Sequence, residues 1–258
     1  MATSSVGKIL RQPITQRLLN SSFALHQGSK LTSQASRRMN DYYLSFINDS
    51  CACPYVTKGQ YMSSVLTDHR DIKQAQGLLF NNYSERHWCW SNENPTGFQV
   101  KQSSSMNYVI DKFDKDSAMW FGTFDEDQLV TAIRLCFRTT ENPLMDIELY
   151  QQSPEKLELH NALRRDNVVE ISRFVTAPQY RSNGIGGTLS LLSMFMFLSK
   201  YNYTAIFTSQ LDFFGKYGIG TLLDRTFDYG DGIHTKAWFY SRDDVEEIAT
   251  MLKKKVNK

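Results

Sequence analysis

The chain has 258 residues, of which 41% are hydrophobic and 13% aromatic, enough for one globular domain with a sizeable core and an extension. Its formal net charge of +2 is too small to indicate a nucleic-acid-binding protein. The four cysteines have no zinc-finger spacing, so we expect no metal site and reduced thiols of an intracellular protein.

Residues 1–40 differ in composition from the rest of the chain. They hold six Lys or Arg, ten Ser or Thr and no acidic residue, which leaves 23 basic residues against 27 acidic ones elsewhere. This composition fits an organellar transit peptide or a disordered basic tail of a cytoplasmic bacterial protein. We expect residues 1–60 to form an N-terminal extension, in which Asp41–Ile47 fits either a strand or a short helix, and residues 61–258 to form one domain.

The first helix of the domain is expected to begin at Thr67–Arg70, with Asp68 as its N-cap. Ile72, Ala75, Leu79 and Tyr83 then follow at helical spacing, which predicts one buried face.

A β-hairpin is predicted from Ala118–Phe124 and Gln128–Arg138, joined by three acidic residues. Apolar residues alternate along the second strand, so we expect one buried face made of Leu129, Thr131, Ile133, Leu135 and Phe137. Arg134 and Arg138 fall on the opposite face. Arg134 could hold a substrate carboxylate through two parallel N–H groups, or form a surface ion pair.

A polar connector, with a short helix expected over Pro154–Leu163, precedes a strand over Val168–Val175 that is rich in β-branched residues. Simple alternation places Glu170, Ser172 and Phe174 on one face, and Ile171, Arg173 and Val175 on the other. A β-bulge would change this assignment.

A glycine turn follows, and a long apolar helix extends from it to Lys200. The first N–H groups of a helix lack intrahelical partners and lie at the positive end of the helix dipole, so they can bind phosphate. Gly184 and Gly186 would let the backbone approach the ligand, with Arg181 as a cation at the rim. The alternative is a plain strand-to-helix connection. The helix is too short and too interrupted by Ser and Thr to span a bilayer; its Met and Phe residues form either ordinary core or an acyl-chain pocket.

The end of the chain predicts a strand over Thr204–Ser209, a strand over Thr235–Tyr240 and a last helix. Asp243 or Asp244 is expected to cap that helix. Its terminal lysines, Lys253–Lys255, suit a helix C-terminus and could also contact an acidic acyl carrier protein.

The turn Arg181-Ser182-Asn183-Gly184-Ile185-Gly186 resembles the (Gln/Arg)-x-x-Gly-x-(Gly/Ala) signature of the GNAT acyltransferase superfamily. The segment Phe213-Phe214-Gly215-Lys216-Tyr217-Gly218-Ile219 resembles the Phe-Tyr-x-Lys-x-Gly-Phe segment of the same family, and the similarity covers about residues 65–240. The resemblance implies a GNAT-like α/β fold with a mixed, mostly antiparallel central sheet flanked by helices. It also implies that residues Arg181, Ser182, Asn183, Gly184, Ile185, Gly186 and Gly187 bind the phosphates or phosphopantetheine of an acyl thioester.

A narrower resemblance covers two motifs upstream. Arg134-Leu135 with Thr139-Thr140 and Pro143-Leu144-Met145, followed by Glu170-Ile171-Ser172-Arg173-Phe174, resemble the acyl-homoserine-lactone synthases and the N-acyl amino acid synthases. Those enzymes carry Arg-Leu-x-x-x-Thr-Thr-x-x-Pro-x-(Met/Leu)-Leu and then Glu-x-Ser-Arg-Phe.

One part of the synthase pattern is missing. The homoserine-lactone synthases have Arg, Phe and Trp near the first helix and then paired aspartates, for adenosylmethionine. Here Phe80 and Trp88 are candidate substrate-binding residues, but Gln76 stands where Arg is expected and no Asp-x-x-Asp follows Trp88 or Trp90 directly. An amino-acid acceptor is therefore favoured over adenosylmethionine.

The resemblance implies catalytic roles for Glu170 and Arg173. Glu170 is the candidate base, with a pKa raised by burial; its alternative role is a structural pair with Arg173. Backbone N–H groups near Phe174 and Val175 would polarise the thioester carbonyl. Many members of the superfamily use a Tyr as acid for the leaving thiolate, where this chain has Phe214, and Tyr217 is the nearest hydroxyl in sequence.

We therefore expect an acyltransferase that moves an acyl group, of long chain, from an acyl carrier protein or coenzyme A to the amine of a small molecule such as an amino acid. The alternatives are an acetyltransferase that uses acetyl-coenzyme A on a protein or polyamine, an acyl-homoserine-lactone synthase, and a non-catalytic module that binds acyl thioesters. A cytoplasmic location is expected, with organelle targeting as the alternative.

Overall fold

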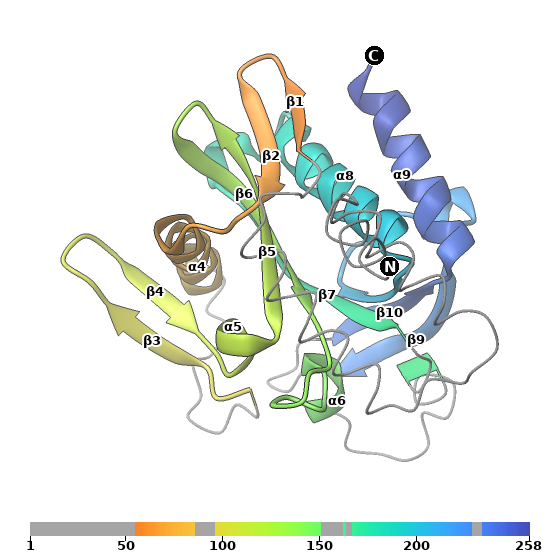
Figure 1. Ribbon diagram of the computed structural model, residues 1–258, viewed down its shortest axis with the longest axis horizontal. Helices are drawn as coiled ribbons and strands as arrows, with labels where there is room; N and C mark the ends of the chain where they lie inside the picture. Colours follow the sequence, from red (N-terminus) through yellow and green to blue (C-terminus); the bar gives the residue numbers. More distant parts are fainter. Residues whose placement is uncertain (1–54, 86–95, 151–161, 164–166, 229–233) are drawn as a thin grey trace, which may run out of the picture.

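The computed structural model describes residues 55–85, 96–150, 162–163, 167–228 and 234–258. An eight-stranded sheet in the order β1-β2-β5-β6-β7-β8-β10-β9 forms its centre (Figure 1). Neighbouring strands run antiparallel, except β7 and β8, which are parallel. The predicted α/β fold with a mostly antiparallel central sheet is confirmed.

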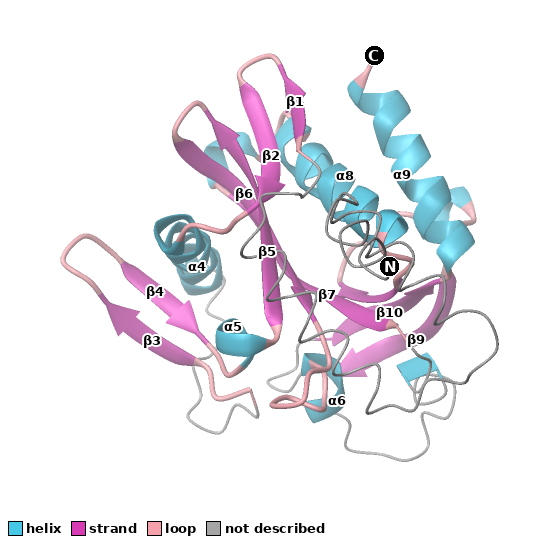
Figure 2. Ribbon diagram, viewed as in Figure 1, coloured by secondary structure: helices cyan, strands magenta, loops and turns pink. Residues whose placement is uncertain are grey.

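The strands of this sheet are β1 (Val56–Lys58), β2 (Tyr61–Val65), β5 (Ala118–Asp125), β6 (Gln128–Cys136), β7 (Val168–Thr176), β8 (Thr204–Ser209), β9 (Thr221–Asp228) and β10 (His234–Tyr240). A separate hairpin is formed by β3 (Gln99–Gln102) and β4 (Asn107–Ile110). The helices are α4 (His69–Glu85), α5 (Phe113–Asp116), α6 (Asp146–Leu149), α8 (Ile185–Lys200) and α9 (Arg242–Val256) (Figure 2). Because β1 pairs with β2, the sheet begins at Val56, within the segment expected to be an extension.

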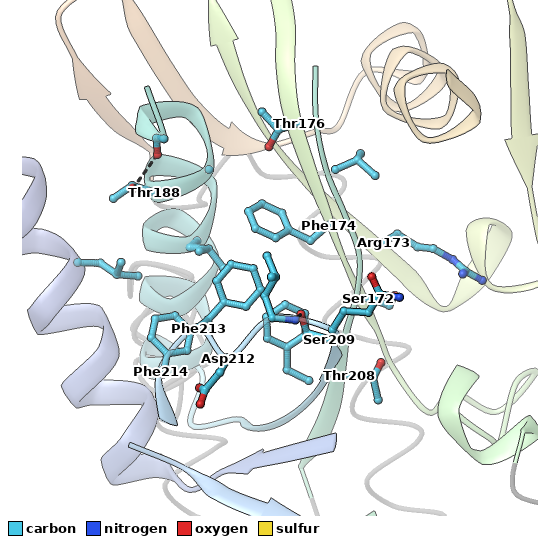
Figure 3. Close-up of a pocket in the computed structure, with 18 of the residues that line it drawn as sticks. Ser172, Arg173, Phe174, Thr176, Thr188, Thr208, Ser209, Asp212, Phe213 and Phe214 are labelled. Atoms are coloured by element: carbon cyan, nitrogen blue, oxygen red, sulfur yellow. Dashed lines mark hydrogen bonds between the residues drawn. The ribbon is translucent and has the colours of Figure 1, made fainter. Parts of the chain in front are cut away.

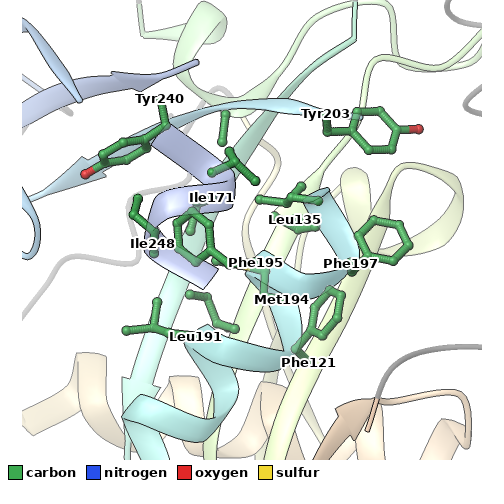
Figure 4. Close-up of a cluster of buried hydrophobic side chains, with 14 of the residues drawn as sticks. Phe121, Leu135, Ile171, Leu191, Met194, Phe195, Phe197, Tyr203, Tyr240 and Ile248 are labelled. Carbon is green, nitrogen blue, oxygen red and sulfur yellow. The ribbon is translucent and has the colours of Figure 1, made fainter. Parts of the chain in front are cut away.

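Helices cover both faces of the sheet (Figure 1). On one face α8 and α9 pack against the sheet and each other, with Met194, Phe195 and Ile248 among the buried residues between them (Figure 4). On the other face α4 packs against β5, β6 and β7, and contributes Ala75 and Leu79 to a second cluster. The predicted buried face of α4 is confirmed, as is the Asp68 cap, because an oxygen of the Asp68 carboxylate accepts a 2.8 Å hydrogen bond from the N–H group of Arg70.

The β5–β6 hairpin forms as predicted, but the expectation of one solvent-facing side is wrong. Every residue of β6 after Gln128 is buried, because α8 covers one face and α4 covers the other. A register shift between Thr123 and Phe124 also moves Leu129 to the α4 face, away from Ile133. Arg134, expected on an open face, is only 1% exposed.

Two predicted elements lie outside the described residues: Asp41–Ile47 and most of the expected helix over Pro154–Leu163. Within the described ranges, no helix combines the length and apolar character that a bilayer-spanning segment needs.

The last helix has a different cap from the one expected. The Ser241 hydroxyl, not Asp243 or Asp244, caps α9 by accepting from the N–H group of Asp244 at 3.2 Å. The Asp244 carboxylate in turn accepts from the N–H group of Ser241 at 2.8 Å, which completes a capping box.

We expect Ser241→Ala to lower the free energy of unfolding by about 1 kcal/mol, because the N–H group of Asp244 at the start of α9 would lose its fixed acceptor. Urea unfolding of this variant beside Asp243→Asn checks the assignment. If the Asp243 variant lost more stability than the Ser241 variant, Ser241 would not be the cap.

Candidate functional site

The sheet opens between its two parallel strands. Pairing of β7 with β8 ends at Ile171 and Phe207, although β7 continues to Thr176 and β8 to Ser209. A cavity of about 1300 Å³ lies at this opening, and its lining includes residues 172–176 of β7 and residues 207–214, at the end of β8 and in the loop after it. The edge of β7 that no longer pairs with β8 therefore faces a space where a ligand backbone could pair with it.

A β-bulge in β7 shapes the wall of this cavity. Between the pairs Ala132–Val175 and Arg134–Ser172, two residues of β7 stand opposite one residue of β6, and Arg173 has a φ of +53°. As a result Phe174 points toward Phe213 on the α8 side, whereas Arg173 points to the other side of the sheet (Figure 3). The β-bulge considered as an alternative in the sequence analysis is present. The simple alternation that placed Phe174 on the same face as Glu170 is therefore wrong.

One wall of the cavity is aromatic. The ring of Phe213 lies 5.6 Å from that of Phe174 and stacks on Phe207 at 5.4 Å. Leu211 and Met251 extend this apolar wall toward α9. Most of the apolar residues of α8 belong to the core instead: Leu189, Met194, Phe195 and Phe197 are completely buried, and only Leu191 among the large residues of α8 lines the cavity. The ordinary-core interpretation therefore holds for most of that helix.

The glycine turn enters α8 at the rim of the cavity. Gly184 is the N-cap and has a φ of +62°, a conformation that glycine adopts without strain. The Asn183 side chain accepts from the N–H group of Ile185 at 3.1 Å, and the N–H groups of Gly186 and Gly187 follow in the first turn, where a helix offers no partner. The expectation that Gly186 lacks a side chain so that a ligand can approach is wrong. A Cβ at Gly186 would lie 2.7 Å from Thr131 Oγ1, so the glycine is needed for close packing of α8 on the sheet.

Arg181 lies at the rim, as expected, and ties the turn to α4. Its guanidinium donates to Asn82 Oδ1 at 2.7 Å and to Glu85 Oε2 at 3.0 Å, and its Nε donates to the carbonyl of Thr176 at 3.2 Å. Its side chain is 40% exposed, so it remains accessible to an anion, while Ser182 and Asn183 beside it are exposed.

Arg134 lies at the centre of a buried charge cluster, which we define as Asp111, Asp114, Asp146 and Glu170 with Arg134 and Arg173. Its Nη1 donates to both oxygens of Asp111 at 2.8 Å and to Asp114 at 3.3 Å, and its Nη2 donates to Asp146 at 3.3 Å. Its Nε donates to the Ser172 hydroxyl at 3.2 Å. The surface-pair interpretation is wrong, and a substrate carboxylate would have to displace carboxylates of the chain itself.

Arg173 lies in the same cluster and lines the cavity. Its Nη2 contacts Asp111 at 3.3 Å and Asp146 at 3.1 Å, and its guanidinium carbon lies 4.9 Å from the centre of the Phe98 ring. The carboxylates that form ion pairs with Arg173 are thus those of Asp111 and Asp146. The alternative role of Glu170, a structural pair with Arg173, is wrong.

Glu170 is completely buried and accepts a 2.8 Å hydrogen bond from the N–H group of Ile147. Burial raises the pKa of the Glu170 carboxyl well above its usual value, and the nearby Asp146 raises it further. Burial raises the pKa of Asp146 as well, whereas Arg134 and Arg173 outweigh burial at Asp111 and lower its pKa. Glu170 is not among the residues that line the cavity, so it has no direct path to a ligand there.

We expect Glu170→Gln to become more stabilising as pH rises. The folded chain holds the Glu170 proton at a pH where the unfolded chain, with a pKa of about 4.3, has released it. The stability of the unmodified protein therefore falls from about pH 4.3 upward through the raised pKa, and Gln, which does not titrate, escapes this loss. Urea unfolding at pH 5 and pH 8 tests this, with Glu246→Gln on the exposed side of α9 as control; a difference independent of pH would contradict it.

Phe214 is 3% exposed and packs edge-on against Phe195 and Tyr240, so it belongs to the core. Tyr217 is 58% exposed and lines the cavity. Phe80 packs against the α4 side of the sheet and is not among the lining residues, and Trp88 lies outside the described residues.

Sequence reasoning missed three acidic residues of the cluster. Asp111 and Asp114 do have Asp-x-x-Asp spacing, but they follow the β3–β4 hairpin, later in the chain than expected. Asp146 stands directly after Pro143-Leu144-Met145, where the synthase pattern has Leu, and this departure was a usable signal. In the described parts of the chain, no group of three or more His, Cys, Asp or Glu is arranged to hold a metal ion.

Comparisons with known proteins give a family match for part of the chain and similar folds. Residues 93–190, from before β3 into α8, match the family model described as an acetyltransferase (GNAT) domain. The sequence has no match among curated proteins. Among solved structures the chain is similar to FeeM, an N-acyl amino acid synthase from uncultured soil microbes, with 12% identity, a TM-score of 0.54 and coverage of 76% of this chain and 98% of that one.

The chain also matches LasI, an AHL synthase, with 16% identity, a TM-score of 0.47 and coverage of 72% of this chain and 91% of that one. At such identities the likeness to FeeM establishes the fold alone. The family match covers β7 and the glycine turn, which line one side of the cavity, but it ends before β8, residues 210–219 and α9, which line the other side. The matched segment, residues 93–190, is thus similar to an acetyltransferase (GNAT) domain, and this match supports an acyltransferase enzyme.

Proposed function

We propose that this enzyme moves an acyl group from a phosphopantetheine thioester to the amine of a small molecule such as an amino acid. The observation that carries the proposal is the opening of the sheet at Ile171 and Phe207, with a cavity of about 1300 Å³ against the unpaired edge of β7. A pantetheine arm is an extended chain with two amide groups, and such a chain can pair with an exposed strand edge as an additional strand does.

The donor's phosphates would lie at the start of α8. The N–H groups of Gly186 and Gly187 and the positive end of the helix dipole suit an anion, and Arg181 adds a cation at the rim. From there the arm would follow β7, so that backbone N–H groups near Phe174 and Val175 polarise the thioester carbonyl.

A long acyl chain fits the aromatic wall better than an acetyl group does. Phe174, Phe207 and Phe213 with Leu211 and Met251 offer more apolar surface than two carbon atoms need. The cavity also exceeds the roughly 300–1000 Å³ of ordinary small-molecule pockets, which leaves space for an arm and a chain together.

The chemistry requires the acceptor's ammonium to lose a proton, after which the amine attacks the thioester carbon, a C–N bond forms and the C–S bond breaks. The second proton of the attacking nitrogen passes to the thiolate. A thiol has a pKa of about 8.5, so the thiolate leaves without a strong acid, and Phe214 in place of Tyr is compatible with turnover. Tyr217 is the hydroxyl we propose near the leaving sulfur, because it lines the cavity.

We propose that Glu170 acts through the backbone and not on the substrate. It holds the N–H group of Ile147 and so fixes the first turn of α6, in which Asp146 faces the cavity. Glu170 is therefore a positioning residue. Arg134 also holds Asp146 in place, by donating a hydrogen bond to its carboxylate.

The donor is either coenzyme A or an acyl carrier protein. Lys254, Lys255 and Lys258 line the cavity at its α9 end, where they suit the phosphates of coenzyme A or the acidic face of a carrier protein. A second product, an acyl-homoserine lactone, is favoured by the Asp111 and Asp114 pair, whose spacing matches that of the homoserine-lactone synthases.

The test is a product screen with purified protein. Isotope-labelled acetyl-, octanoyl- and palmitoyl-coenzyme A, and the same chains on a bacterial acyl carrier protein, are each offered with a pool of amino acids, polyamines and adenosylmethionine. We expect a labelled long-chain N-acyl amino acid in mass spectra, in amounts equal to the thiol released. Transfer of acetyl alone would favour an acetyltransferase, a labelled lactone would favour the second product, and donor binding without any product would contradict catalysis.

A further inference from the structure

Two polar atoms in the wall of the cavity are buried and have no partner among the described residues. The Oδ2 atom of Asp146 contacts both Arg134 and Arg173, but its Oδ1 atom has no hydrogen-bond partner. The Nε atom of Arg173 likewise has none. Both residues line the cavity, and the Asp146 side chain is 1% exposed.

An unpaired buried acceptor and an unpaired buried donor each cost about 1–3 kcal/mol, so native proteins seldom keep both on one wall. Asp146 is the first residue of α6, which Glu170 fixes through the N–H group of Ile147. The carboxylate is thus held in place for a partner that the described residues do not supply.

The charge of the surroundings indicates which partner suits Asp146. The buried charge cluster has four carboxyl groups and two guanidinium groups. Because Glu170 holds its proton, the excess of negative charge is that of three Asp carboxylates over two guanidinium groups. Lys112 also acts on Asp146 electrostatically, and Cys136 lies nearby as a neutral thiol whose pKa is raised by burial. A cation at Asp146 Oδ1 would reduce this excess, and the common cation among amine acceptors is the ammonium group itself.

The bulge in β7 places this pair beside the proposed reaction centre. Arg173 and Phe174 are consecutive, yet Arg173 points to Asp146 while Phe174 faces the aromatic wall (Figure 3). Ser172, which precedes Arg173 in β7, also lines the cavity. A molecule held by Asp146 and Arg173 would therefore lie on the opposite side of β7 from the acyl chain. The thioester carbonyl of the donor would lie between the two.

We propose that Asp146 and Arg173 form the acceptor subsite: Oδ1 of Asp146 binds the substrate ammonium and takes one proton from it, and Nε of Arg173 binds the neighbouring carboxylate. The acceptor is then an α-amino acid. This assignment rests on the proposed function and adds a residue that the synthase pattern does not have, since Leu stands there. The proton on Asp146 returns to solvent after the amide leaves, and the second proton of the nitrogen leaves with the thiol.

Asp146→Asn tests the subsite, with Asp146→Leu as second variant and exposed Asp116→Asn as control. Thermal melting and coenzyme A titration establish that each variant is folded and binds donor. We expect the Asn variant to raise the KM for the amino acid about tenfold or more and to lower kcat about 100-fold or more, while the KM for the donor changes less than about twofold. An unchanged amino-acid KM and kcat in both Asp146 variants would overturn the assignment.

Binding measurements separate this inference from the proposed function. Amino acids, their amides and the matching decarboxylated amines are titrated calorimetrically onto protein saturated with coenzyme A. We expect the amino acid to bind at least about tenfold more tightly than its decarboxylated amine, and to lose this binding in Asp146→Asn. If the protein binds an amino acid in this way but transfers no acyl group, the proposed function fails and the subsite stands. If the unmodified protein binds none of the three classes, the subsite is overturned.

Discussion

Replacing Arg134 by Leu is expected to lower the free energy of unfolding by about 3–5 kcal/mol, the usual cost of removing one partner from a buried ion pair. Arg134 is 1% exposed and is the shared partner of Asp111, Asp114 and Asp146. Without it the cluster would keep four carboxyl groups against the single guanidinium of Arg173. Urea unfolding monitored by circular dichroism measures the loss.

Two further variants show whether uncompensated charge is the cause. Arg138→Leu removes an arginine from a pair with Glu148 that is 18% and 15% exposed, and we expect a clearly smaller loss. Adding Asp111→Leu to Arg134→Leu should cost less than the sum of the two single changes, because one unpaired carboxylate disappears with its partner. Additive losses would contradict the electrostatic explanation and leave only lost packing against Trp120 and Phe113.

Replacing Gly184 by Asp is expected to weaken coenzyme A binding about tenfold or more while leaving the fold intact. A Cβ at Gly184 meets no atom within 4 Å, and Asp and Asn tolerate its φ of +62° better than other residues. A carboxylate there would even favour the positive end of the α8 dipole. It would, however, repel a phosphate bound at the first N–H groups of that helix.

Gly184→Asn is the matched control, because it has the same shape and no charge. Calorimetric titration of coenzyme A into both variants at low and high salt separates charge from shape. We expect the Asp variant to recover part of its affinity at high salt, since salt screens the repulsion. Equal affinities for the two variants would mean that the donor's phosphates do not lie at the start of α8.

Local patterns in the sequence predicted the elements that build the cavity. The β-branched residues of Val168–Val175 predicted a strand, and the length of the apolar run up to Lys200 predicted a helix. Both elements form as expected. The glycine turn between them was predicted from its glycines, and Gly184 does have a positive φ, which other residues seldom adopt. The β3–β4 hairpin and β9 were missed. For β3 the reason is that Gln99–Gln102 is exposed throughout and carries no apolar alternation.

The charge cluster could be predicted only in part. Arg134, Glu170 and Arg173 were found through motifs, but the carboxylate partners of the two arginines lie up to 62 residues away in sequence and meet them only in the folded sheet. The direction of Arg173 depends on a bulge, which shifts side chains by one position without changing composition. Two-sided burial of Arg134 depends on α4 covering the second face of β6, which no pattern within β6 reveals.

Amide hydrogen exchange with and without coenzyme A tests most directly whether the donor lies in the opening between β7 and β8. We expect the ligand to slow exchange in the peptides that contain Ser172–Thr176 and Gly184–Thr188, in the unmodified protein and in Gly184→Asn but much less in Gly184→Asp. Protection confined to other segments, or none at a concentration of coenzyme A that calorimetry shows to be saturating, would contradict a donor site at the open edge of β7.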